Sequence, residues 1–306
     1  MSGLSRTSRR RFLQTGVAAA AGAALFRFDV SAQAKISTID LGGLTLLQGA
    51  GCNVLALGGP DGALMIDGGL AANADALIAA VKTATRTTRI NTLIDTHWHP
   101  EQTGANELVG RSGGVIIAHE KTKTMVSHTV YGANGFTRRV PALPEPARPT
   151  KTVRLDGSMD FSVTKIDYGY MPAAHTDGDL YVHVPSLNVL AAGGVVSAEE
   201  WPLLDYKNGA WLGGRVRAVE HLADIVKPDT RVVPSAGRVM TGKEIVAQRD
   251  MYQKLFKTMI GYLNMGLGPE DAVKRNPLRE YQSDFGDPSK FTYDALKSMM
   301  IAYVPD

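Results

Sequence analysis

The strongest constraint on the fold is the alternation of short apolar runs with turn residues and helical segments. Residues 36–70 read ISTIDLGGLTLLQGAGCNVLALGGPDGALMIDGGL, where β-branched and leucine-rich runs are separated by Gly, Asn and a Pro-Asp-Gly turn. This pattern predicts consecutive strands joined by tight turns. A helix is predicted over ADALIAAVKTAT, residues 74–85, with Asn73 as its N-cap.

The alternation continues along the rest of the chain. Strands are predicted at INTLIDT, GGVIIAH, LYVHVP and NVLAAGGVV, a hairpin at 152–170 and an amphipathic helix at GRVRAVEHLADIV. Residues 131–153 contain four prolines and no apolar period, so a long loop is predicted there. From Gly242 on the chain reads as mostly helical, with a helix start at Pro269. Together these elements predict an α/β sandwich, with two packed sheets and helices outside them, in one domain over residues 35–306.

The first thirty-four residues have the pattern of an export signal. SRRRFLQTGVAAAAGAALF has a basic head and an apolar middle, and Ala32-Gln33-Ala34 resembles a cleavage site. The Arg9-Arg10 pair indicates a twin-arginine address and not an anchor, since the apolar run 17–25 is shorter than the roughly 20 residues that span a bilayer. We therefore expect a periplasmic or otherwise exported protein with no stable membrane anchor.

Removal of this segment changes the charge of the chain. It takes away five arginines and one aspartate, so the formal net charge falls from +3 to −1. No basic stripe with interleaved aromatic residues remains, which argues against a nucleic-acid partner. Cys52 is the only cysteine, so no intrachain disulfide can form.

Three histidines stand out by their order along the chain. His97 and His99 follow a predicted strand in THWHPEQTGAN, and His175 lies in AHTDGD. Two histidines one residue apart can point to the same side of an extended chain. Asp67 ends the strand-like ALMIDGG, and NVLAAGG and VVPSAGR follow at growing intervals. The other histidines lie in strand-like or helical runs, where ordinary packed or exposed side chains are expected.

This ordered set resembles the metallo-β-lactamase fold superfamily over essentially all of residues 36–240. It is similar to the exported, hydrolase-like branch, whose phrases run like THWHxDHxGGN, AHTxGD, NVLFxGD and VVPGHG. The resemblance implies an αββα sandwich, here with extra C-terminal helices, that holds two metals at the edge where the sheets meet. His97, His99 and His175 match the three histidines of the first metal site.

The second metal site departs from the family pattern at every ligand. Glu101 stands on the family's aspartate, Gln102 on its fourth histidine, Gly194 on its bridging aspartate and Ala236 on its last histidine. Glycine and alanine have no donor atom, and a glutamine amide is a poor zinc ligand. Three imidazoles with one open position are nevertheless a known catalytic zinc geometry. We therefore expect one divalent ion, zinc or another metal.

The neighbouring residues suggest further roles. Glu101 could reach the metal, accept a proton or form a salt bridge, and as a general base it would need to lie about 3 Å from the reacting water. Asp67, Gln102 and Asp179 are expected to orient a ligand or order the loops around it. An aromatic pocket for a small-molecule substrate is predicted from four side chains, with core packing as the alternative reading: Trp98, Tyr131, Trp201 and Tyr206.

Two functions from different classes follow. The first is an exported mononuclear hydrolase that acts on an ester, lactone or related bond. The second is a metal-poor relative that has kept the fold to bind a small periplasmic ligand or a protein partner. Nothing in the sequence identifies a β-lactam pocket.

Overall fold

The computed structural model describes residues 35–133 and 139–303. The predicted export signal lies outside these residues, as do 134–138 within the predicted long loop. The described residues from 35 onward belong to one compact unit. In this part of the chain, none of the helices combines the length and the apolar character needed to cross a membrane.

The N-terminal half forms a seven-stranded sheet. An antiparallel meander leads into parallel strands, in the order β1 (Ser37–Asp40), β2 (Leu44–Gln48), β3 (Val54–Gly59), β4 (Gly62–Ile66), β5 (Ile90–Ile94), β6 (Val115–His119) and β9 (Lys151–Val153). The predicted Pro60-Asp61 turn closes the β3–β4 hairpin, where Gly59 pairs with Gly62. Because β4 and β5 are parallel, their carboxyl ends lie at the same edge of the sheet.

The second sheet has six strands that follow the order of the chain. They are β10 (Gly157–Phe161), β11 (Thr164–Met171), β12 (Asp179–Val184), β13 (Val189–Gly193), β14 (Arg231–Pro234) and β15 (Met240–Thr241). β13 and β14 are parallel and the other pairs antiparallel. A separate two-stranded ribbon joins β7 (Val130–Tyr131) to β8 (Arg139–Val140).

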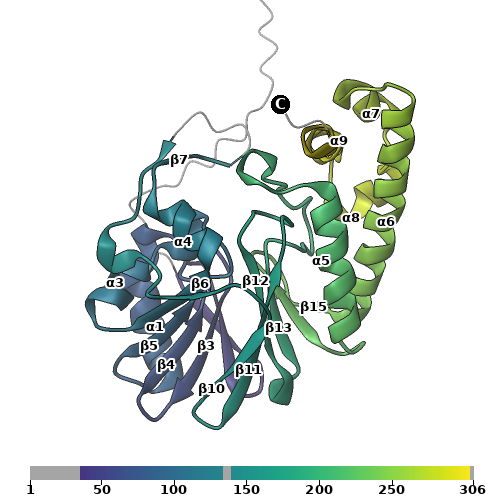
Figure 1. The fold of residues 1–306 in the computed structure, drawn as a ribbon. Helices are drawn as coiled ribbons and strands as arrows, with labels where there is room; N and C mark the ends of the chain where they lie inside the picture. The colour runs from purple at the N-terminus through teal and green to yellow at the C-terminus, as the bar shows by residue number, and fades with distance from the viewer. Residues whose placement is uncertain (1–34, 134–138, 304–306) are drawn as a thin grey trace, which may run out of the picture. The chain divides into compact units, whose positions relative to one another are not determined.

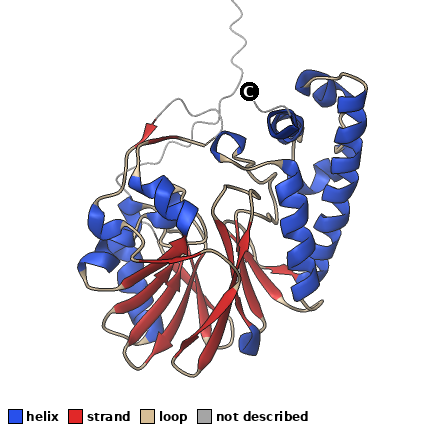
Figure 2. Ribbon diagram, viewed as in Figure 1, coloured by secondary structure: helices blue, strands red, loops and turns tan. Residues whose placement is uncertain are grey.

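The two sheets pack face to face, as the sequence predicts. One buried core contains side chains from both, such as Leu46 and Ile66 of the first sheet and Ile166 and Val182 of the second. The helices lie outside the two sheets (Figure 1, Figure 2). On the first sheet these are α1 (Ala74–Thr85) and α3 (Asn106–Arg111), followed along the chain by α4 (Glu120–Ser127). On the second sheet α5 (Leu212–Ile225) packs beside α6 (Gly242–Asn264).

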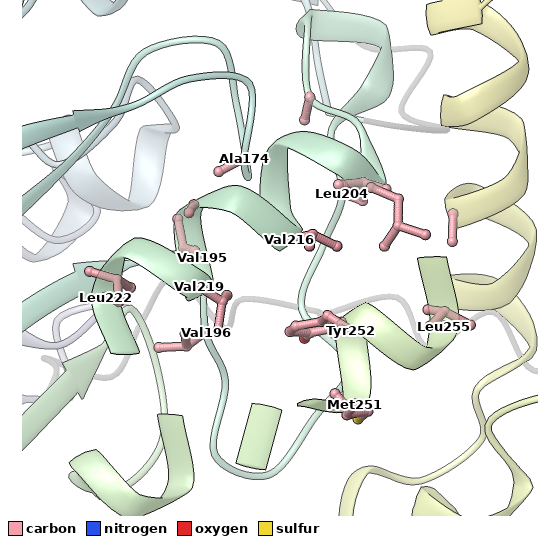
Figure 3. Close-up of a cluster of buried hydrophobic side chains, with 14 of the residues drawn as sticks. Ala174, Val195, Val196, Leu204, Val216, Val219, Leu222, Met251, Tyr252 and Leu255 are labelled. Carbon is pink, nitrogen blue, oxygen red and sulfur yellow. The ribbon is translucent and has the colours of Figure 1, made fainter. Parts of the chain in front are cut away.

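The helices after β15 extend the sandwich on the side of α5. α6 starts with a capping box between Thr241 and Glu244, and it is followed by α7 (Pro269–Arg275), α8 (Gln282–Phe285) and α9 (Ser289–Tyr303). α7 begins at Pro269, as predicted. Buried residues of α5, α6 and α9 share one apolar core with Leu204 and Val196, part of which is shown in Figure 3. Short 3-10 turns complete the chain: η1 (Ala71–Asn73), η2 (Glu145–Ala147), η3 (Pro185–Leu187), η4 (Tyr206–Asn208) and η5 (Arg279–Tyr281).

Two local predictions are wrong. Asn73 immediately precedes α1, but its side chain does not cap the helix. Its amide Nδ2 instead donates to the Ala50 carbonyl 3.0 Å away, a partner that sequence spacing does not reveal. The predicted loop 131–153 ends in β9, which pairs in parallel with β6 because Val153 carries a buried apolar side chain next to His119.

Candidate metal centre

The three predicted ligand histidines meet at the edge between the two sheets. His97 and His99 follow β5, and His175 lies in the loop between β11 and β12. All three are buried, and one donor nitrogen from each lies within 4.8 Å of the other two. Their ring centroids are 4.6–4.9 Å apart and the ring planes are nearly perpendicular, at 84–85°. A metal ion could therefore be approached by three lone pairs from different directions.

Hydrogen bonds fix which nitrogen of His99 and His175 carries the proton. The His175 Nδ1–H donates to the Leu203 carbonyl at 2.8 Å, because a carbonyl can only accept. The His99 Nε2–H donates to Asp205 Oδ2 at 3.1 Å. His175 Nε2 and His99 Nδ1 are thereby left with their lone pairs for a metal.

A relay of two hydrogen bonds, from His97 through Thr96 to Asp67, fixes which nitrogen of His97 carries the proton. The Thr96 hydroxyl donates to Asp67 Oδ2 at 2.9 Å, so its oxygen accepts from His97 Nδ1 at 3.0 Å. His97 Nε2 then keeps its lone pair. Asp67 also accepts from the Thr96 amide and has a left-handed backbone with φ of 64°. Asp67 was predicted to support a ligand imidazole; its carboxylate contacts Thr96, which in turn contacts His97, and does not contact a histidine directly.

The two bare nitrogens explain why this cluster fits a cation. His175 Nε2 and His99 Nδ1 are only 3.2 Å apart, and two lone pairs at that distance repel unless a positive charge lies between them. Burial and the neighbouring histidines lower the pKa of His97 and His175 well below the usual range. Burial opposes protonation of His99 as well, but the Asp205 hydrogen bond and nearby carboxylates raise its pKa. A proton on His99 can occupy the gap, and a metal would compete with that proton.

Glu101 and Gln102 lie beside the histidines on the short helix α2 (Pro100–Thr103). Glu101 Oε1 is 3.8 Å from His99 Nδ1, and its side chain is 42% exposed. A carboxylate in this place could exchange protons with solvent and with a group at the metal position. Gln102 is buried, with Nε2 3.5 Å from Ser235 Oγ, so it fills space next to the site.

The place of a second metal lacks donors. Ala236 is exposed and carries no ligand atom, and the Gly194 backbone lies directly against the His175 ring. Cys52 is buried near Gln102 and Asp67, and burial, followed by the Asp67 charge, raises the pKa of its thiol. Among the described residues, His97, His99 and His175 are the group of potential ligand side chains close enough to share an ion.

Asp179 orders the loop that carries His175. Its carboxylate accepts from the backbone amides of His175 and Thr176 and from the Thr176 hydroxyl, at 2.7–3.0 Å. These bonds tie the start of β12 to the ligand. The role is structural, because Asp179 is buried and its contacts are with the backbone and Thr176.

The predicted aromatic pocket is not assembled as expected. Trp98 is buried with its ring against His99, 4.6 Å between centroids, so it supports the ligand from behind. Trp201 packs between Phe285 and Phe291 in the C-terminal helical region. Tyr131 is 60% exposed beneath Arg139, and Tyr206 lies half-buried in η4. Neighbours in sequence diverge here, because Trp201 packs against the C-terminal helical region whereas Leu203 and Asp205 contact the ligand histidines.

Three groups that hold the ligands were missed from the sequence. Asp205 lies in the apolar stretch WPLLDYKN, where nothing marks it as a partner of His99. The Leu203 carbonyl is a backbone group, so its contact with His175 has no sequence signal. Thr96 could have been found, because it directly precedes His97. His119, read as an ordinary packed histidine, caps α4 and stacks on Tyr170.

Comparisons with known proteins agree with this architecture. Residues 47–238 match the family model of the metallo-beta-lactamase superfamily. The fold is similar to a metallo-beta-lactamase from Pontibacter korlensis, with 20% identity, a TM-score of 0.54 and coverage of 71% of this chain and 93% of that one. A metallo-beta-lactamase from Erythrobacter litoralis has 17% identity and a TM-score of 0.53, covering 71% and 99%.

A third solved structure also covers much of the C-terminal extension. It is the stereoselective inverting sec-alkylsulfatase Pisa1 from Pseudomonas sp., with 13% identity and a TM-score of 0.65. The match covers 89% of this chain but 50% of that protein, so this chain spans about half of its length. No curated protein sequence matches the chain.

The family match covers more than half of the chain, and the sandwich carries a three-histidine cluster at the sheet edge. The protein belongs to the metallo-beta-lactamase superfamily.

Proposed function

We propose that the protein is an exported hydrolase that uses a single zinc ion bound by His97 Nε2, His99 Nδ1 and His175 Nε2. The observation that carries the proposal is the set of hydrogen bonds that turns these three lone pairs towards one point. A buried cluster of histidines whose protons are all held elsewhere is suited to a cation. The superfamily membership supports a hydrolytic reaction.

The donor set favours zinc among common metals. Imidazole suits zinc, copper, iron and nickel, and three histidines leave the open fourth position typical of catalytic zinc. When bound, zinc would polarise a substrate oxygen and lower the pKa of a coordinated water to about 7. One ion is proposed because Gly194 and Ala236 offer no side-chain donor for a second.

The protein's own residues divide the remaining work. Asp67, through Thr96, and Asp205 hold two of the imidazoles in their binding tautomers. Glu101 is an exposed carboxylate 3.8 Å from His99 Nδ1, and we assign it the exchange of a proton with the reacting water and then with the leaving group. Trp98 shields one side of His99 from water.

For the substrate we propose a small molecule with an ester, a lactone or a related bond. Sulfate esters belong in this group, because the similarity to the sec-alkylsulfatase covers a larger share of this chain than the similarity to the metallo-beta-lactamases does. We propose export by the twin-arginine-type signal, with neither a nucleic-acid partner nor a stable membrane anchor.

Metal analysis of the purified mature protein is the first test. We expect about one equivalent of zinc and turnover of at least one member of a panel of aryl esters, lactones and alkyl sulfates. His97→Ala should lose both, whereas His128→Ala, an exposed histidine on α4's C-terminal side, should keep both. A metal-free wild-type protein without turnover would favour the ligand-binding alternative. Unchanged metal content and turnover in His97→Ala would refute the proposed centre.

A further inference from the structure

Arg215, in the first turn of α5, is a fully buried side chain with no acidic partner in contact. It is 0% exposed, and none of the ion pairs among the described residues includes its guanidinium. The carboxylate of Asp179 acts on it only through space. Burying a cation without a paired acid is costly unless strong hydrogen bonds replace its hydration. The burial of Arg215 therefore depends on the hydrogen bonds that its guanidinium donates.

The guanidinium donates to three backbone carbonyls from two separate segments. Nη1 donates to Gly194 at 3.3 Å and to Val195, at the end of β13. Nη2 donates to Leu203, in the segment that leads to η4. The planar fork of Arg can bridge two segments in a fixed geometry, which a single ammonium group cannot do.

Both segments contact the imidazole ring of His175. The Leu203 carbonyl that accepts from Arg215 also accepts from His175 Nδ1. The Gly194 backbone lies against the other side of the ring, where an added Cβ would be 2.3 Å from His175 Cδ2. Arg215 thus connects the Leu203 carbonyl, which sets the His175 tautomer, with the Gly194 backbone, which limits the position of the His175 ring.

Close packing keeps the guanidinium in this place. Gly214 brings α5 so near the loop before His175 that an added Cβ would be 2.0 Å from the Ala173 carbonyl. On the other side the buried ring of Tyr252, from α6, lies 6.0 Å from the guanidinium carbon. Figure 3 shows Tyr252 together with Val195, Leu204 and Val216 in the surrounding apolar core. The C-terminal extension thereby reaches the metal centre through Arg215.

We infer that Arg215 is a positioning residue for His175, holding both carbonyl segments so that Nε2 points at the metal position. As far as the metal is concerned, this inference rests on the proposed function. The hydrogen bond from His175 Nδ1 to the Leu203 carbonyl, which sets the tautomer, does not require a metal.

The test compares Arg215→Met and Arg215→Lys with the wild-type mature protein. Zinc affinity is measured by competition with a chromophoric chelator, and the His175 tautomer by ¹⁵N NMR of the metal-free protein. Arg231→Met is the matched control. Arg231 also donates to a backbone carbonyl, that of Leu187, but it lies at the start of β14, whereas Ser235, next to the histidine site, follows the end of that strand. Loss of residues that orient a metal ligand weakens affinity by about 10- to 100-fold.

We expect a loss of this size in Arg215→Met, a smaller loss in Arg215→Lys and none in Arg231→Met. The Nδ1–H form of His175 should dominate in the wild type and give way to a mixture in Arg215→Met. If Arg215→Met does not fold, Arg215→Lys decides, because the lysine ammonium lacks the planar fork whose two terminal nitrogens reach the two segments. Native affinity and a native tautomer in a folded Arg215 variant would overturn the inference. A wild-type protein that binds no zinc would overturn the proposed function, while the tautomer measurement would still decide the role of Arg215.

Discussion

The imidazole of His175 lies directly on the backbone of Gly194. A Cβ added to Gly194 would be 2.3 Å from His175 Cδ2 and 2.4 Å from Nε2, closer than real atoms approach. The position where relatives carry a bridging aspartate is therefore closed to any side chain while His175 keeps this place. A side chain at position 194 and the His175 ring would therefore occupy the same space.

Gly194→Asp is expected to weaken zinc binding and not to restore a second ion. The new side chain must displace the His175 ring, so we expect affinity to fall by about 10-fold or more. Metal stoichiometry and chelator competition measure both effects. Gly261→Ala is the control, because nothing lies within 4 Å of its added Cβ. Two equivalents of zinc in Gly194→Asp would contradict this prediction.

Removing the acceptor for His99 should also weaken the centre. Asp205 accepts from His99 Nε2 and from Asn208 Nδ2, so Asp205→Ala frees the ring to turn and to change tautomer. We expect about 10- to 100-fold weaker zinc binding, and a smaller loss in Asp205→Asn, which keeps one acceptor oxygen. The exposed Asp229→Ala should bind zinc as the wild type does. Wild-type affinity in a folded Asp205→Ala would show that His99 needs no such support.

Asp67→Asn should reverse the relay to His97. The new amide can donate to Thr96 Oγ1, whose hydroxyl then donates to His97 Nδ1 and moves the proton of the ring to Nε2. Because Nε2 faces the metal position, we expect zinc affinity to fall by about 10- to 100-fold. ¹⁵N NMR of the metal-free variant reports the tautomer. Thr96→Ser keeps the hydroxyl and should retain the wild-type proton position, whereas an unchanged His97 tautomer in Asp67→Asn would exclude the relay.

Glu101→Gln should separate catalysis from metal binding. The side chain lies near His99 but is partly exposed, so its loss should leave zinc content unchanged. If Glu101 transfers the proton, kcat should fall by about 100-fold or more. Glu107→Gln is the control, because Glu107 pairs with Arg111 at the surface. Equal kcat in Glu101→Gln and the wild type would remove Glu101 from the mechanism.

The contribution of Asp67 to the stability of the metal-free protein should fall as pH rises from about 4 to 7. Burial, partly offset by the Thr96 hydrogen bonds, raises the pKa of Asp67 from 3.8 to about 7. Between these values the folded state holds a proton that the unfolded state has released, so the free energy of unfolding decreases with pH, by up to about 4 kcal/mol. Urea unfolding at several pH values measures this slope. The difference between the wild type and Asp67→Asn isolates the contribution of Asp67, because Asp179, His97 and His175, whose pKa values are also shifted, are present in both proteins. A difference in the free energy of unfolding that does not change with pH would contradict this prediction.

Much of the fold follows from local patterns in the sequence. The bounds of α1 agree with the predicted helix 74–85, and α7 begins at the predicted Pro269, because apolar spacing and proline chemistry act within a few residues. The paired sheets follow from alternating strands and turns. Asn73 and β9 depart from prediction because a distant carbonyl and a neighbouring strand supply their partners.

Residue types and their spacing are enough to predict the superfamily, the sandwich and the ligand set His97, His99 and His175. Which nitrogen of each ring faces the other two histidines follows from the tertiary structure alone. That choice depends on Thr96, on Asp205 and on the Leu203 carbonyl, two of which reach a histidine from distant segments of the chain. Arg215 and Gly194 act on His175 through backbone atoms, which every residue possesses. Such contacts arise from packing and leave no mark in the sequence.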